Sequence, residues 1–132
     1  MPAVKSNRPV NLSMGQVLDV NLKSPVAIAS ILHRLSGVIV FLLVPVLLWI
    51  LDKSLSSPEG FAQVQAVFDS FIVRFVVWVF VAGLIYHLIG GIKHLFADLG
   101  VAEELQSGRI AATISLILSA IVIVAAFVWI VL

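Results

Sequence analysis

Two groups of polar side chains recur at helical spacing beside apolar segments of this chain. At 3.6 residues per turn, the spacings i, i+3, i+4, i+7 and i, i+4, i+7, i+11 each place their members on one helical face. The first group is Ser30, His33, Arg34 and Gly37, and the second is Gly83, His87, Gly90 and His94. Polar side chains within an apolar span are costly unless they face protein, a cofactor or water. We therefore expect the two faces to point at each other or at a shared site.

The histidines are the side chains best suited to bind a metal ion at membrane depth. The sequence has no cysteine, and both methionines, Met1 and Met14, precede the apolar segments. A b-type haem fits the pattern, since its iron accepts imidazole ligands, its macrocycle needs an apolar slot and its propionates need polar partners. Close helix packing at the glycines, with histidines bonded across the helices, fits as well, and so does a pathway for ions or protons.

Ser30 and Arg34 form a second candidate site. A guanidinium group is permanently charged and carries five donors, so in a partly desolvated pocket Arg34 could bind a carbonyl or carboxylate oxygen and stabilise a developing anion. Ser30 adds a neutral hydroxyl group one turn away. The alternative is an arginine that reaches lipid phosphate and a serine bonded to the carbonyl group one turn before it.

Composition indicates which elements position these residues. Hydrophobic residues make up 61% of the 132 residues and charged residues 11%, which is too little polar surface for a water-soluble globule. Three apolar runs predict transmembrane helices near residues 25–51, 71–96 and 110–132. We therefore expect an all-α membrane protein, with an N-terminal segment over 1–24 and one three-helix domain over 25–132. The net charge of +1 provides no basic face for nucleic acid.

The ends of these helices carry further signals. Ser24 followed by Pro25 is typical of an N-cap and a first helical position, and Pro45 should kink the helix that follows. Residues 52–65 and 98–109 are expected to be loops between antiparallel helices. Lysine and arginine concentrate in the N-terminal segment and the second loop. The positive-inside rule thus predicts an up-down-up arrangement with a cytoplasmic N-terminus and a periplasmic C-terminus.

Four strings of the sequence resemble one family over nearly the whole chain. They are RPVNL at 8–12, SILHRLSG at 30–37, LSSPEGF at 55–61 and YHLIGGIKHLFADLG at 86–100. Together they resemble the cytochrome b subunit of bacterial succinate dehydrogenase, which is the larger of the two membrane anchors of succinate:ubiquinone oxidoreductase. The patterns HRxSG and HxxxGxxHxxxD are specific when they occur together.

The resemblance implies roles for particular residues. His87 matches the axial ligand of haem b, and the second axial ligand in that family is a histidine of the smaller anchor subunit. Ser30 and Arg34 match the residues of the ubiquinone site. His33 and Arg34 also match groups near the haem propionates, and His94, with Gly90, matches the haem surroundings. Lys93 stands where arginine is common in the family.

The resemblance also implies partners and a setting. Electrons from succinate would pass through a flavoprotein and an iron–sulfur subunit on the cytoplasmic face of the bacterial inner membrane to ubiquinone. The three helices would form part of a heteromeric helix bundle, and the isolated chain would not catalyse the reaction. The alternatives are a fumarate reductase anchor that uses menaquinone, a haem-free structural anchor, and a small transporter.

Overall fold

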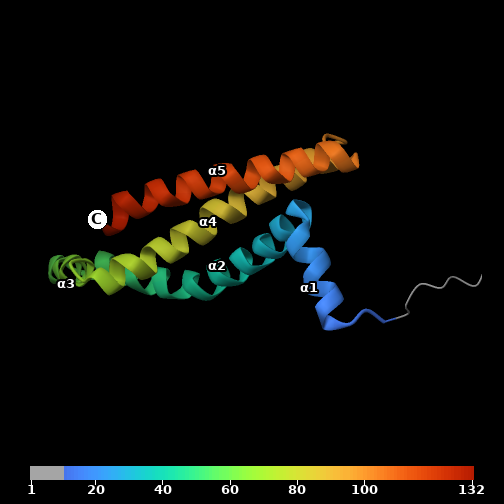
Figure 1. The fold of residues 1–132 in the computed structure, drawn as a ribbon. Coiled ribbons are helices and arrows are strands. Elements are labelled where there is room, and N and C mark those ends of the chain that lie inside the picture. Colours follow the sequence, from blue (N-terminus) through green and yellow to red (C-terminus); the bar gives the residue numbers. More distant parts are fainter. Residues whose placement is uncertain (1–10) are drawn as a thin grey trace, which may run out of the picture.

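The computed structural model describes residues 11–132, and this part of the chain is built from helices without any strand (Figure 1). The helices are α1 (Met14–Lys23), α2 (Pro25–Ser56), α3 (Pro58–Phe68), α4 (Phe71–Asp98) and α5 (Leu105–Val131). Three of them, α2, α4 and α5, are long and apolar enough to cross a membrane. The predicted all-α membrane protein with three spans is thus confirmed. Residues 1–10, which include Lys5 and Arg8, lie outside the described part.

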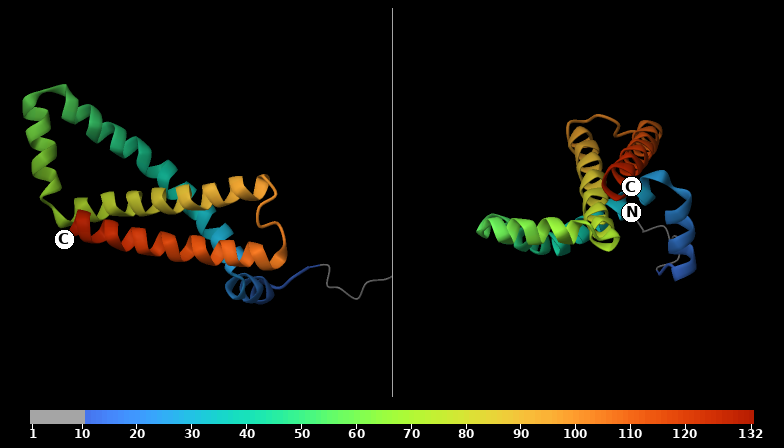
Figure 2. Two further views of the ribbon diagram at one scale, coloured as in Figure 1. Left: turned by 90° about the horizontal axis from the view of Figure 1, so that it is seen from above. Right: turned by 90° about the vertical axis from the view of Figure 1, so that its left-hand side faces the viewer.

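The three long helices do not form a parallel stack. Helix α5 runs back alongside α4 over its whole length, whereas α2 crosses α4 obliquely and then diverges from it (Figures 1 and 2). Trp78 of α4 donates a hydrogen bond from Nε1 to the carbonyl oxygen of Ile123 in α5 at 3.1 Å, and its ring contacts Phe127 edge-on at 5.1 Å. The α4–α5 pair is therefore joined between the first half of α4 and the last part of α5, and α2 approaches α4 most closely where the two cross.

Small residues fill most of the buried positions between the helices. They are Ala29, Ser36, Gly60, Gly83, Gly90, Ala112, Ser115 and Ser119. Small side chains let helix backbones approach closely, which is the usual means of packing in membrane proteins. Many large apolar side chains of the described residues are instead exposed, for example Phe41 at 77% and Trp129 at 86%. Such surfaces suit contact with lipid or with another membrane subunit.

The predicted start of α2 is confirmed at Ser24. The Ser24 hydroxyl accepts a hydrogen bond from the backbone N–H of Ala27 at 3.5 Å, and Pro25 occupies the first helical position. The helix continues through Pro45, and Figure 1 shows α2 bowed along its length. Before it, α1 begins with a capping box, in which Ser13 and Gln16 exchange side-chain and backbone hydrogen bonds.

Both predicted loops are longer than the connections that the structure shows. Residues 52–65 are helical apart from Ser57, because Ser57 caps a new helix by accepting a hydrogen bond from the N–H of Gly60 at 2.9 Å, with Pro58 at the first position. The predicted loop over 98–109 is reduced to residues 99–104. This short connection turns at Gly100 and Ala102, which both adopt positive φ, at 81° and 64°.

Gly60 makes the sharp turn from α2 into α3 possible. A Cβ atom there would lie 2.5 Å from the carbonyl oxygen of Lys53 and 2.7 Å from Ser56 Oγ. Because a backbone oxygen cannot move aside easily, we expect Gly60→Ala to destabilise the protein by about 2 kcal/mol. A lowered midpoint of thermal unfolding in detergent would show this. Gly15→Ala is the matched control, since its Cβ would contact only Ser13 Oγ at 4.0 Å; an equal effect of both would contradict the prediction.

Candidate haem and quinone site

The crossing of α2 and α4 brings the two predicted polar faces together. The imidazole rings of His33 and His87 stack with centroids 4.1 Å apart and planes inclined by 9°. The ring of His94 approaches His33 edge-on at 5.1 Å. The expectation that the two faces point at each other is confirmed for these three histidines. Within residues 11–132, however, no three histidine, cysteine, aspartate or glutamate side chains converge on a metal position.

Hydrogen bonds fix which nitrogen of His87 carries the proton. His87 Nδ1 lies 3.2 Å from the carbonyl oxygen of His33 and 3.2 Å from Ser36 Oγ, and this hydroxyl donates to the same carbonyl at 2.7 Å. A carbonyl oxygen only accepts, so Nδ1 must be the protonated nitrogen. Nε2 then keeps its lone pair, which is the form of imidazole that binds a metal ion.

His33 makes the reciprocal contact with α4. Its Nε2 donates a hydrogen bond to the carbonyl oxygen of His87 at 3.2 Å, so each histidine contacts the backbone of the other. One turn away, the Tyr86 hydroxyl donates to the carbonyl oxygen of Ala29 at 3.0 Å. The two helices are therefore held together at this crossing by directed bonds as well as by packing.

Glycines make room for the imidazole rings. A Cβ atom at Gly90 would lie 2.7 Å from His33 Cδ2, and one at Gly37 would lie 3.1 Å from His87 Cε1. The side of Gly90 that we expected to face a cofactor edge is thus covered by the His33 ring. These contacts support the packing role of the glycines, and they also orient the histidines.

Ser30 and Arg34 lie on α2 and make no hydrogen bond to the histidine cluster. Ser30 is half-buried and Arg34 is exposed, and among residues 11–132 neither side chain has a hydrogen-bond partner. The serine does not bond to the carbonyl group of its own preceding turn, unlike Ser36, Ser115 and Ser119. Both polar groups are therefore free to bind a ligand from outside the chain.

Ser36 is the residue of this site that the spacing argument missed. It is buried, at 5% exposure, and contacts both histidines. Ser36 lies six residues after Ser30, outside the chosen stripe, but three residues after His33, which is a helical neighbour position. A search for hydrogen-bonding residues around each histidine would have found it.

Comparison with known proteins decides the family. Residues 5–127 match the family described as succinate dehydrogenase/fumarate reductase transmembrane subunit. The succinate dehydrogenase cytochrome b556 subunit of Coxiella burnetii is 36% identical over 96% of this chain and 99% of its own length. The chain belongs to the family of succinate dehydrogenase cytochrome b subunits. The subunits of the same name from Paracoccus denitrificans and Rickettsia prowazekii are 30% and 33% identical, over 80% and 61% of this chain and 78% and 62% of their own lengths.

Membership of this family agrees with the fold, and the matched region includes the histidine cluster. A succinate dehydrogenase cytochrome b subunit is a membrane subunit that works with other subunits, in keeping with the three spans and the exposed apolar surface. In this cytochrome b subunit, the residues from Ser30 to His94 that form the crossing fall inside the matched region.

Proposed function

We propose that this chain binds haem b through His87 Nε2 and forms part of the ubiquinone-reduction site of succinate dehydrogenase. The observation that carries the proposal is the hydrogen bonding of His87, whose Nδ1 is engaged by the His33 carbonyl and by Ser36. An imidazole held in this way has a fixed orientation and tautomer, as metal-binding histidines almost always do. As the family resemblance implies, a histidine of the smaller anchor subunit would complete the axial pair.

The other residues of the crossing suit the edge of a haem. Haem b, when bound, would supply a centre that accepts and releases one electron. His33, His94 and Arg34 would provide hydrogen bonds and positive charge for the propionates, since these carboxylates need such partners near the membrane surface. Gly90 would keep the backbone close to the histidines, in line with its contact with His33.

Arg34 and Ser30 would bind the quinone. The Arg34 guanidinium would donate to a carbonyl oxygen of ubiquinone and stabilise the negative charge that develops there on reduction. The Ser30 hydroxyl would donate to the same carbonyl oxygen, and protons would arrive from the cytoplasmic side. Their lack of partners within the described residues supports a ligand-binding role.

The family resemblance implies a setting in the bacterial inner membrane, and the distribution of lysine and arginine supports a cytoplasmic N-terminus. In Figure 1, α1 and the α4–α5 connection lie at the same end of the bundle, as an up-down-up chain requires. We place residues 1–24 and this connection in the cytoplasm and the C-terminus in the periplasm. The iron–sulfur subunit, carrying the flavoprotein, would dock at the cytoplasmic end.

A difference spectrum tests the proposal. The complex purified through this chain should show b-type bands when the dithionite-reduced spectrum is compared with the oxidised one, and it should reduce ubiquinone with succinate. A folded complex without these bands would indicate that the chain is a haem-free structural anchor. Reduction of menaquinone but not of ubiquinone would indicate the fumarate reductase alternative.

Ser36→Ala should shift the redox potential of the haem without removing it. The variant loses one hydrogen bond to His87 Nδ1 but keeps the bond to the His33 carbonyl. A less basic imidazole stabilises ferric iron less, so the midpoint potential should rise, on the order of tens of millivolts. Redox titration of the b-type band measures this. Ser54→Ala is the control, because Ser54 also bonds to the carbonyl group three residues before it, without touching a histidine; an unchanged potential in Ser36→Ala would contradict the prediction.

A further inference from the structure

We propose that the cleft between α4 and α5 binds one phospholipid whose headgroup carries both a phosphate and a primary ammonium group, as in phosphatidylethanolamine. The cleft has a volume of about 490 Å³ and lies away from Ser30 and Arg34, neither of which lines it. This volume falls in the range of ordinary small-molecule sites. None of the residues assigned above to the haem or the quinone lines this cleft.

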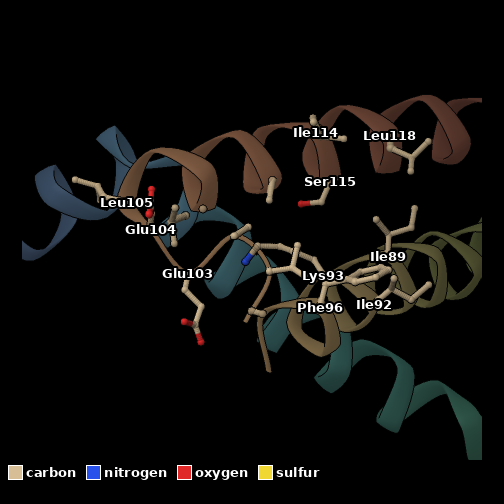
Figure 3. A pocket seen from close by; sticks show the side chains of 16 residues that line it. Ile89, Ile92, Lys93, Phe96, Glu103, Glu104, Leu105, Ile114, Ser115 and Leu118 are labelled. Atoms are coloured by element: carbon tan, nitrogen blue, oxygen red, sulfur yellow. The ribbon is translucent and has the colours of Figure 1, made fainter. Parts of the chain in front are cut away.

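The body of the cleft is apolar. Ile89, Ile92 and Phe96 line it from α4, and Ile114 and Leu118 line it from α5 (Figure 3). Its walls come from membrane spans, chiefly α4 and α5 with Val26 of α2, so a hydrocarbon chain would meet the same kind of surface there as in the bilayer. An acyl chain is therefore better suited to the interior of the cleft than a polar ligand.

The depth of the cleft matches one leaflet of a membrane. At 1.5 Å per residue, its walls extend about 10 Å along α4, from Phe96 to Ile89, and about 20 Å along α5, from Leu105 to Leu118. One half of the hydrocarbon core of a bilayer is about 15 Å thick. The cleft begins where both spans end, at the connection 99–104, so its mouth lies at headgroup level.

The charged groups that line the cleft gather toward this mouth. Glu103 and Glu104 lie at the connection itself, and Lys93, about 5 Å deeper along α4 than Phe96, reaches toward them in Figure 3. Within residues 11–132, none of the three takes part in an ion pair, since the pair found there joins Lys23 to Asp19. One cation and two carboxylates at the end of an apolar cleft suit an amphiphile with charges of both signs.

These charges also select the headgroup. The Lys93 ammonium would pair with the phosphate, and the carboxylates of Glu103 and Glu104 would accept hydrogen bonds from the lipid ammonium. An anionic phospholipid without an ammonium group would instead bring its phosphate next to two unpaired carboxylates, which is unfavourable. A quinone has no charged headgroup and would leave all three side chains without partners.

Lipid analysis of the purified complex tests this proposal. The complex is isolated through this chain from membranes that contain phosphatidylethanolamine and phosphatidylglycerol, washed in lipid-free detergent, and its retained phospholipid is measured by mass spectrometry. The wild type should retain a stoichiometric amount of phosphatidylethanolamine. Lys93→Gln should retain about tenfold less after the same wash, because a charge-assisted hydrogen bond is lost.

Three further variants test the space of the cleft and its charges separately. Ala111→Leu places a larger side chain in the cleft and should abolish retention, whereas Ala120→Leu, at an exposed position of α5 outside the cleft, should not. Combined Glu103→Gln and Glu104→Gln should exchange phosphatidylethanolamine for phosphatidylglycerol.

Three results would overturn the proposal. The first is a wild type that retains no more lipid than Ala111→Leu, and the second is a headgroup preference that the paired glutamine substitutions leave unchanged. The third comes from a photo-crosslinking residue at Ile114, which lines the cleft and is 59% exposed. If it captured another subunit of the complex instead of lipid, the cleft would be a protein interface.

Discussion

Replacement of His87 by leucine will abolish the b-type bands in the reduced-minus-oxidised spectrum of the purified complex. The substitution removes Nε2, the His87 nitrogen that the hydrogen bonds of the crossing leave unbonded. Loss of an outer-sphere partner alone costs about 10- to 100-fold in metal affinity, and loss of a direct ligand should cost more. Haem content per chain, measured as the pyridine haemochrome, gives the size of the effect.

His94→Leu is the comparison variant for this experiment, because it removes an imidazole that we assign to the haem propionates and not to the iron. His94 lies on the same helix but is exposed and contacts His33 only through its ring edge. We expect this variant to keep its haem, with at most a shifted band. The amount of assembled complex in the membrane must be compared in both variants. Retention of haem in His87→Leu, or loss of haem in His94→Leu alone, would show that a residue other than His87 binds the haem iron.

Arg34→Leu will lower succinate:ubiquinone reductase activity by about 100-fold, the usual cost of removing a donor to a developing oxyanion. Oxidation of succinate with a soluble dye as electron acceptor should remain largely intact, because that reaction bypasses the quinone. Arg34→Lys should give a smaller loss, since it keeps the charge without the planar donor pair. Ser30→Ala should cost about tenfold, as expected for one hydrogen bond.

The ratio of the two activities separates a site effect from an assembly defect. Arg74→Leu is the control, because Arg74 belongs to the first turns of α4, far along the helix from the crossing. A defect of folding or assembly lowers both activities and leaves their ratio unchanged. An unchanged ratio in Arg34→Leu would show that this arginine does not act on the quinone.

Most of the fold could be predicted because the membrane imposes a length and a composition on each span. The start of α2 was also predictable, since Ser24 and Pro25 carry a local signal. The same signal at Ser57 and Pro58 was interpreted as a loop, because serine, proline and glycine are frequent in loops too. Residues 105–109 were missed because α5 extends past its apolar run into a polar first turn.

The candidate site was predictable only in part. Helical periodicity correctly placed His87 and His94 on one face of a helix, and the cost of polar groups in a span predicted that this face meets the face of His33. The ring stacking and the bonds from each imidazole to the opposite backbone depend on where two helices cross and how closely they approach. That approach is set by Gly37 and Gly90, whose missing side chains admit the rings. Sequence spacing therefore identifies the residues that make the contact, but it does not show which ring nitrogen bonds to which carbonyl oxygen.

The reciprocal bonds between His33 and His87 also fix the relative height of the two helices. If α2 slid along α4 by one turn, about 5.4 Å, both imidazole–carbonyl bonds and the ring stack would be lost together. Helices commonly adapt to bilayers of different thickness by tilting. In this molecule α2 touches α4 at the crossing and diverges from it beyond (Figure 2). The relative height of His87 and Arg34 is therefore set by the crossing itself and not by the outer part of α2.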